Sequence, residues 1–157
     1  MKILGIDPGI HRFAVVLIED QTVAAYRIFR PRGPDLGAKL KSLYESFTDL
    51  LEAWAPELAV METVIYHRNV RAALTLGSAR GVALLALYQK EIPVMELSPT
   101  RIKQAITGNG RASKPQVAYV VRQLLNFQEE VPLDVTDAMA CALAVQRELK
   151  MQRLIGE

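Results

Sequence analysis

The chain has 157 residues, 50% of them apolar, so we expect a single domain over residues 1–157 with one sizeable core. Its net charge is only +2 at pH 7. Its one cysteine, Cys141, excludes an internal disulfide and is typical of a reducing compartment. No signal-peptide pattern opens the chain, and the longest apolar run, residues 82–88, is too short to cross a bilayer, so we expect a soluble, cytoplasmic protein without membrane contact.

The first part of the chain predicts a meander of strands, a helix and a further strand. Three apolar runs predict strands and lie at residues 3–7, 13–18 and 23–29. The short connections between them favour antiparallel pairing. Apolar residues at helical spacing predict an amphipathic helix over residues 36–54, which Asp35 can cap and Pro56 ends. Residues 58–61 are apolar on both faces, which is typical of a central parallel strand.

A second helix is predicted over residues 70–89. It contains Ala73, Gly77 and Gly81 at intervals of four residues, so these three small residues share one face. Such a stripe allows close approach of another element, either the sheet or a second subunit.

The rest of the chain predicts one more strand and three helices. The strand is expected at residues 92–96, and Ser98 precedes a short helix. Ser113 and Gln116 have the spacing of a capping box. The helix that they open carries an apolar stripe, predicted to be buried, of Val117, Val120, Val121, Leu124 and Leu125. The last helix is expected at about residues 134–150.

Four carboxylates occur where they can converge. Asp7 ends the first apolar run directly before a Pro-Gly turn, and Glu62 follows the run at residues 58–61. In open α/β sheets, ligands collect at the C-terminal ends of the strands. Asp134 and Asp137 are three residues apart, so they face the same side of the last helix. Oxygen ligands suit Mg²⁺ and Mn²⁺, and two such ions can activate water and stabilise the leaving oxygen when a nucleic-acid backbone is cut.

Each carboxylate also has a simpler interpretation. Asp7 can shape the Pro-Gly turn, and Glu62 can lie in a surface salt bridge. Asp134 and Asp137 can be an N-cap and an N3 acid that the helix dipole favours. Cys141, four residues after Asp137, can lie near a metal or be a small core residue. The combination favours a metal site, because two of the acids end apolar runs where a solvated charge is not needed.

Basic residues are concentrated in the middle of the chain. Residues 63–128 hold nine lysine and arginine residues against two acids, a net charge of +7, whereas the remainder carries −5. This asymmetry suggests a polyanionic partner, although an ordinary solvated surface gives the same pattern. The candidate DNA contacts, with Tyr66 able to stack on an unpaired base, are Tyr66, Arg68, Arg71, Arg80, Lys103, Arg111 and Lys114.

Four segments match a known family in order and spacing. They are residues 5–9 (GIDPG), 62–64 (ETV), 76–83 (LGSARGVA) and 134–138 (DVTDA). In these segments the chain resembles the bacterial Holliday-junction resolvases of the RuvC type. The resemblance implies an α/β, ribonuclease-H-like fold with a central five-stranded mixed sheet flanked by helices. It also implies a homodimer that grips a four-way DNA junction and nicks two strands of like polarity.

The same resemblance implies roles for particular residues. Asp7, Glu62, Asp134 and Asp137 are expected to be catalytic and to bind two Mg²⁺ or Mn²⁺ ions, with Asp7 bridging them. Water would attack the phosphodiester and leave 5′-phosphate and 3′-hydroxyl ends. Lys103 and Lys114 match basic positions that engage the scissile region, and Lys114 is expected to take part in catalysis. The branch-migration proteins RuvA and RuvB are the expected partners.

One position departs from the family pattern, and two other functions stay open. The pattern has a phenylalanine three residues after the motif glutamate, which stacks at the junction centre; here that position is Ile65, followed by Tyr66. Either Tyr66 replaces it or an aliphatic wedge suffices. The alternatives are a non-catalytic, structure-specific DNA-binding protein, and a related nuclease that acts on RNA or on other branched DNA.

Overall fold

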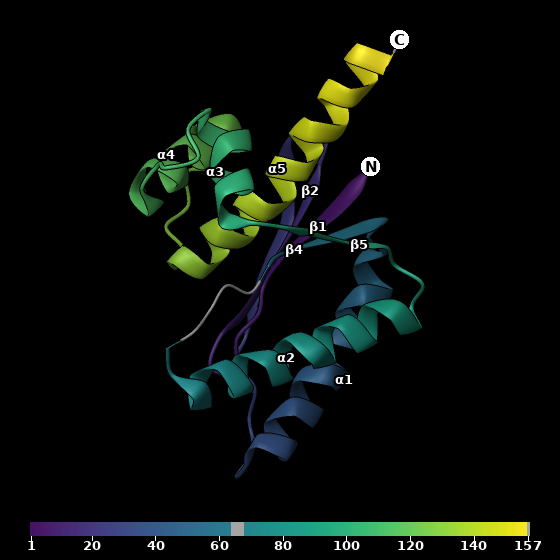
Figure 1. Cartoon of the computed structure of the whole chain (residues 1–157). Coiled ribbons are helices and arrows are strands. Elements are labelled where there is room, and N and C mark those ends of the chain that lie inside the picture. Colours follow the sequence, from purple (N-terminus) through teal and green to yellow (C-terminus); the bar gives the residue numbers. More distant parts are fainter. Residues whose placement is uncertain (64–67, 157) are drawn as a thin grey trace.

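The computed structural model describes residues 1–63 and 68–156 and contains a five-stranded mixed sheet (Figure 1). The strand order is β3-β2-β1-β4-β5. The bounds of the strands are Lys2–Asp7 for β1, Phe13–Glu19 for β2, Thr22–Phe29 for β3, Leu58–Glu62 for β4 and Val94–Leu97 for β5. The first three pair antiparallel, whereas β4 pairs parallel with both β1 and β5. The predicted meander and central parallel strand are confirmed, and β5 begins two residues later than expected.

Five helices are described. Their bounds are Leu36–Trp54 for α1, Val70–Gln89 for α2, Pro99–Thr107 for α3, Lys114–Leu124 for α4 and Leu133–Gly156 for α5. Asp35 caps α1, and the predicted capping box of Ser113 and Gln116 is present at α4. The expected stripe on α4 is partly wrong: Val121 and Leu125 are buried, but Leu124 is 39% exposed. Only the edge of α4 that meets α5 is covered.

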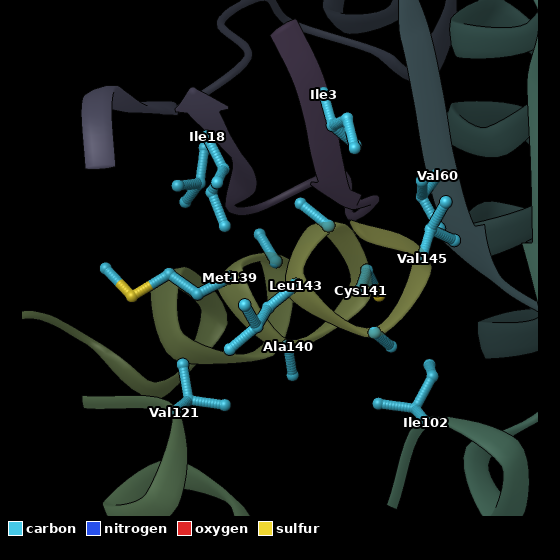
Figure 2. Packing of buried hydrophobic residues seen from close by; sticks show 14 of the residues in the cluster. Ile3, Ile18, Val60, Ile102, Val121, Met139, Ala140, Cys141, Leu143 and Val145 are labelled. Carbon is cyan, nitrogen blue, oxygen red and sulfur yellow. The ribbon is translucent and has the colours of Figure 1, made fainter. Parts of the chain in front are cut away.

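The helices cover both faces of the sheet in unequal layers. Helices α1 and α2 pack on one face, and α5 packs on the other with α3 and α4 outside it (Figure 1). Figure 2 shows α5 lying between Ile3 and Val60 of the sheet and Ile102 and Val121 of the outer helices. Because α5 is enclosed on both sides, residues 138–145 are buried all round, and the helix lacks a clear polar face.

The small-residue stripe of α2 does not face the sheet. A Cβ atom added at Gly77 or Gly81 would meet nothing within 4 Å. The helix instead directs Ala79, Ala83 and Leu87 into the core that it shares with α1. Of the two interpretations of the stripe, contact with the sheet is therefore wrong.

Among the described helices, α2 alone is long and apolar enough to cross a membrane, by length and composition only. Its mean hydropathy over an 18-residue window is 1.4. This helix is longer than the apolar run at residues 82–88, since glycine, serine and threonine residues interrupt its apolar sequence without ending the helix. One such helix is weak evidence for a membrane span, and Arg71 and Arg80 lie within it.

Candidate active site

Strand alternation directs Asp7 and Glu62 to the same face of the sheet. Successive side chains of a strand point to opposite faces. Ile3 of β1 and Val60 of β4 both belong to the core on the α5 side, so the residues an even number of positions further on, Asp7 and Glu62, face α5 as well. The last paired residues of these parallel strands are Ile6 and Met61. The two acids therefore leave the sheet side by side, one position beyond that pair.

A glycine lets α5 come close to β1 beneath these acids. A Cβ atom at Gly5 would lie 1.9 Å from the carbonyl oxygen of Ala138 and 3.1 Å from the Cβ of Ala142. Helix α5 thus crosses β1 almost at backbone contact. Asp137 directly precedes Ala138, and Asp134 lies one turn earlier, so the close approach places this pair next to Asp7.

Three of the four predicted carboxylates meet directly. Asp7, Asp134 and Asp137 each offer an oxygen atom such that the three atoms lie within 4.8 Å of one another. Glu62 lies beside this group, and it lines a small pocket of about 50 Å³ together with Asp137 and Lys114. The acids come from a strand, a second strand and a helix that are far apart in the chain.

The electrostatics of the acids reflect this crowding. Burial raises the pKa of Asp7, and the negative charges of Asp137, Asp134 and Glu62 raise it further, to about 8. Burial likewise raises the pKa of Asp137 and of Glu62, and Lys114 partly offsets both shifts. Carboxylates that repel one another in this way are relieved by a cation.

Basic side chains border the acids. The Nζ atom of Lys114 lies 3.7 Å from a carboxylate oxygen of Asp137, and Lys103 lines the same pocket. On the other side, Nε of Arg12 lies 3.0 Å from Oδ2 of Asp134. Sequence reasoning missed Arg12, because its partner is far away in the chain and no local spacing links the two.

The donor set fits a divalent cation. Oδ2 of Asp134 is buried and has no hydrogen-bond partner in the described part of the chain, since its contact with Arg12 lacks hydrogen-bond geometry. An unsatisfied buried carboxylate oxygen beside two further carboxylates is suited to a hard cation such as Mg²⁺ or Mn²⁺. Asp7, Asp134 and Asp137 would supply the ligands, with Glu62 at the edge.

Cys141 satisfies both interpretations that its position allowed. Its side chain is only 3% exposed, yet it lines the pocket that contains Glu62 and Asp137. Burial raises the pKa of the thiol, and the nearby carboxylates raise it further. The buried thiol is therefore a packing residue in the wall of this pocket.

The candidate DNA contacts fall into different surroundings. Arg68, Arg71 and Arg111 are exposed. Arg80 differs, because its guanidinium donates to the carbonyl of Glu62 and pairs with Glu96, and its side chain is 11% exposed. It thus ties α2 to the end of β4 and has little surface left for DNA. Tyr66 lies outside the described residues, as does Ile65.

The chain is similar to known proteins over nearly its whole length. The family model described as "Crossover junction endodeoxyribonuclease RuvC" matches residues 3–145. A protein of that name from Halorhodospira halophila is 40% identical over 146 residues, which cover 90% of this chain and 87% of the relative. Its counterpart from Thermotoga petrophila is 38% identical, with 90% of each chain covered.

Solved structures agree with the sequence matches. A structure described as "T. thermophilus RuvC in complex with Holliday junction substrate" matches with a TM-score of 0.88 at 26% identity and covers 96% of both chains. The yeast mitochondrial Holliday junction resolvase Ydc2 has the same fold, with a TM-score of 0.69 at 16% identity. This match covers 98% of this chain and 82% of that chain. The α/β, ribonuclease-H-like fold is thereby confirmed. This chain belongs to the crossover junction endodeoxyribonuclease RuvC family.

Proposed function

We propose that this protein is a metal-dependent endonuclease that resolves four-way DNA junctions by nicking two strands of like polarity. One observation carries the proposal: acids from β1, β4 and α5 converge beside two lysines in a member of this family. The two nicks would leave 5′-phosphate and 3′-hydroxyl ends that a ligase can seal. Because the substrate is chromosomal DNA in a bacterial family, the protein would work in the cytoplasm.

The acids would hold two Mg²⁺ or Mn²⁺ ions. Asp7 has Asp134 and Asp137 close by and Glu62 within electrostatic reach, so these four residues would hold the ions. When bound, ions of this kind activate a water molecule and neutralise charge on the leaving oxygen. The carboxylates would fix where that water and the scissile phosphate meet, because all four come from strands or a helix rather than loops.

Two lysines would place the phosphate. Lys114 is the first residue of α4, so its ammonium and the helix N-terminus both favour an anion. It keeps its Nζ atom close to Asp137, and Lys103 reaches the same pocket from α3. A phosphodiester at the acids would therefore have a positive group beside its non-bridging oxygens. Arg68, Arg71 and Arg111 would bind the DNA backbone further out.

The exposed face of α2 would form a homodimer. Besides Gly77 and Gly81, this face carries large apolar residues at helical spacing that are more than half exposed: Val70, Leu74, Leu85 and Tyr88. A continuous apolar stripe with small residues at its centre suits two helices that pack closely around a twofold axis. Two symmetric cuts need two active sites, and RuvA and RuvB would complete the assembly on DNA.

Digestion assays test the proposal. We expect the wild-type protein with Mg²⁺ or Mn²⁺ to nick a mobile four-way junction but neither a linear duplex nor an RNA–DNA hybrid. Asp7→Asn should abolish nicking and still bind the junction, since the basic surface is unchanged. Asp49→Asn removes the same charge from an exposed position on α1 and should behave as wild type.

The alternatives give different results in the same assays. A non-catalytic junction-binding protein would bind without cutting, whatever metal is added. A nuclease for another substrate would prefer the hybrid or a different branched DNA. Equal cleavage by wild type and Asp7→Asn would overturn the assignment of the active site.

A further inference from the structure

Arg12 contacts one of the carboxylates of the candidate active site and is also exposed to solvent. It lies in the turn between β1 and β2, and its Nε atom contacts Oδ2 of Asp134 at 3.0 Å. The side chain of Arg12 is 52% exposed, whereas that of Asp134 is 26% exposed. The guanidinium therefore reaches one of the proposed metal ligands from the solvent side.

The contact between these two side chains is an ion pair without hydrogen-bond geometry. Oδ2 of Asp134 has no hydrogen-bond partner in the part of the chain that the structure describes, in spite of the nearby Nε atom. Arg12 is half exposed and contacts this oxygen through one nitrogen atom, so a divalent cation that binds the same oxygen can replace it. Among the described residues, Asp134 is the acid that pairs with Arg12, and it does so through Nε.

A groove begins beside Arg12. It has a volume of about 350 Å³ and lies between the turn that follows β1 and the first two turns of α2. His11 lines one wall and Arg71 the other, and both are exposed. The groove thus has a basic residue on α2 facing the turn that carries Arg12, and this turn directly follows Asp7 at the end of β1. These features suit a negatively charged strand that passes close to the cleaved bond.

We propose that Arg12 exchanges partners during the reaction. In the metal-free protein it is the counter-ion of Asp134 and limits the repulsion among the acids. Once a divalent cation occupies Oδ2, the guanidinium turns to a phosphate of the DNA strand in the adjacent groove. Its planar fork can bind two oxygens of one phosphate, which a lysine cannot do. This inference rests on the proposed function, because it requires both the metal and the DNA.

Metal binding provides the first test. A counter-ion competes with the cation, so Arg12→Ala should bind Mn²⁺ about 2- to 5-fold more tightly than wild type in calorimetry. Arg12→Lys keeps the charge and should bind Mn²⁺ as wild type does. Arg153→Ala, which removes an exposed arginine from the far end of α5, is the matched control and should also be unchanged.

The opposite result would show that Arg12 merely holds Asp134 in place. In that case Arg12→Ala would bind Mn²⁺ more weakly than wild type, or equally, and the exchange would be refuted. The proposed function fails in a different way: wild type itself, and not only the variant, would then show no Mn²⁺ binding that Asp7→Asn removes.

Kinetics on a four-way junction provide the second test. With saturating Mn²⁺, Arg12→Ala should raise KM about 10-fold and change kcat less than about 2-fold, since a charge-assisted phosphate contact is lost while the acids stay in place. The slope of log KM against log salt concentration should decrease by about one. Arg12→Lys should rescue the slope but only part of KM. An unchanged slope, or a loss confined to kcat, contradicts a phosphate contact.

Discussion

At the scale of single residues, the carboxylate of Asp7 is destabilised by its surroundings in the metal-free protein. Burial and three neighbouring acids raise its pKa from 3.8 to about 8, so the folded protein holds a proton there that the unfolded chain has lost. Between pH 4 and 8 the unfolded state binds fewer protons, and the stability of the fold therefore decreases as pH rises through this window. Below pH 4 both states are protonated, and the effect disappears.

Asp7→Asn should consequently stabilise the metal-free protein at pH 8. We expect a gain of about 1–3 kcal/mol in the free energy of unfolding, less than the full shift implies because neighbouring acids share the protons. The gain should vanish near pH 4. Thermal unfolding in chelator from pH 4 to 9 measures it. Mn²⁺ should then raise the Tm of wild type far more than that of the variant, and a less stable Asp7→Asn at pH 8 would contradict the crowding of the acids.

A second residue sets how closely the acids can meet. Gly5→Ala places a methyl group 1.9 Å from the carbonyl of Ala138, so α5 must move away from β1. We expect a loss of about 1–3 kcal/mol in urea unfolding, together with a nicking rate per folded molecule that falls as Asp137 shifts. Gly37→Ala, within α1, is the control. Its added Cβ atom meets only a side-chain oxygen of Asp35 at 3.6 Å, and alanine is the better helix former, so this variant should be slightly more stable than wild type. Nicking unchanged in a destabilised Gly5→Ala would show that α5 does not position the acids.

At the scale of elements, the sequence predicted every described helix and strand, and the errors lie at their ends. Strand β5 starts later than its apolar run, because Ile92 packs in the loop. Helix α5 continues six residues past the predicted end at 150, since its last turns project beyond the sheet and no breaker stops them before Gly156. Periodicity locates an element, but tertiary contacts decide where it stops.

The candidate site was predictable to a different extent for acids and for bases. Asp7 and Glu62 could be found because strand ends and alternation are local signals. Arg12 could not, since its contact with Asp134 depends on how α5 crosses the sheet. The sequence predicts a DNA contact at Arg80, because it does not reveal that Glu96 and the end of β4 occupy the guanidinium.

Helix α2 provides a prediction at this scale. Leu74 is 68% exposed on the stripe that contains Gly77 and Gly81. Leu74→Glu would bury a charge in the proposed dimer, so we expect monomers in analytical ultracentrifugation with an unchanged circular-dichroism spectrum. Tyr119→Glu changes an equally exposed residue on α4 and should leave the dimer intact. Persistence of the dimer in Leu74→Glu would place the interface elsewhere.

At the scale of the whole molecule, the candidate active site lies at one end of the sheet. The acids lie at the C-terminal ends of β1 and β4 and at the start of α5, whereas α2 packs with α1 on the opposite face of the sheet (Figure 1). A chain with one such site can cut one strand in each binding event. Resolution of a junction needs two cuts, so a dimer through α2 would have to bring two sites to one junction at the same time.

Mixed dimers of wild type and Asp7→Asn test this coupling. A cruciform in a supercoiled plasmid is reabsorbed after a single nick, so linear product arises only when both strands are cut in one binding event. Wild type should give mainly linear plasmid. With the variant in large excess, nearly every active subunit has an inactive partner, and the product should shift to nicked circles. Gel electrophoresis measures the ratio of the two products. Inactive homodimers lower the total amount cut but not this ratio, so an unchanged linear fraction would mean that the two cuts do not depend on paired subunits.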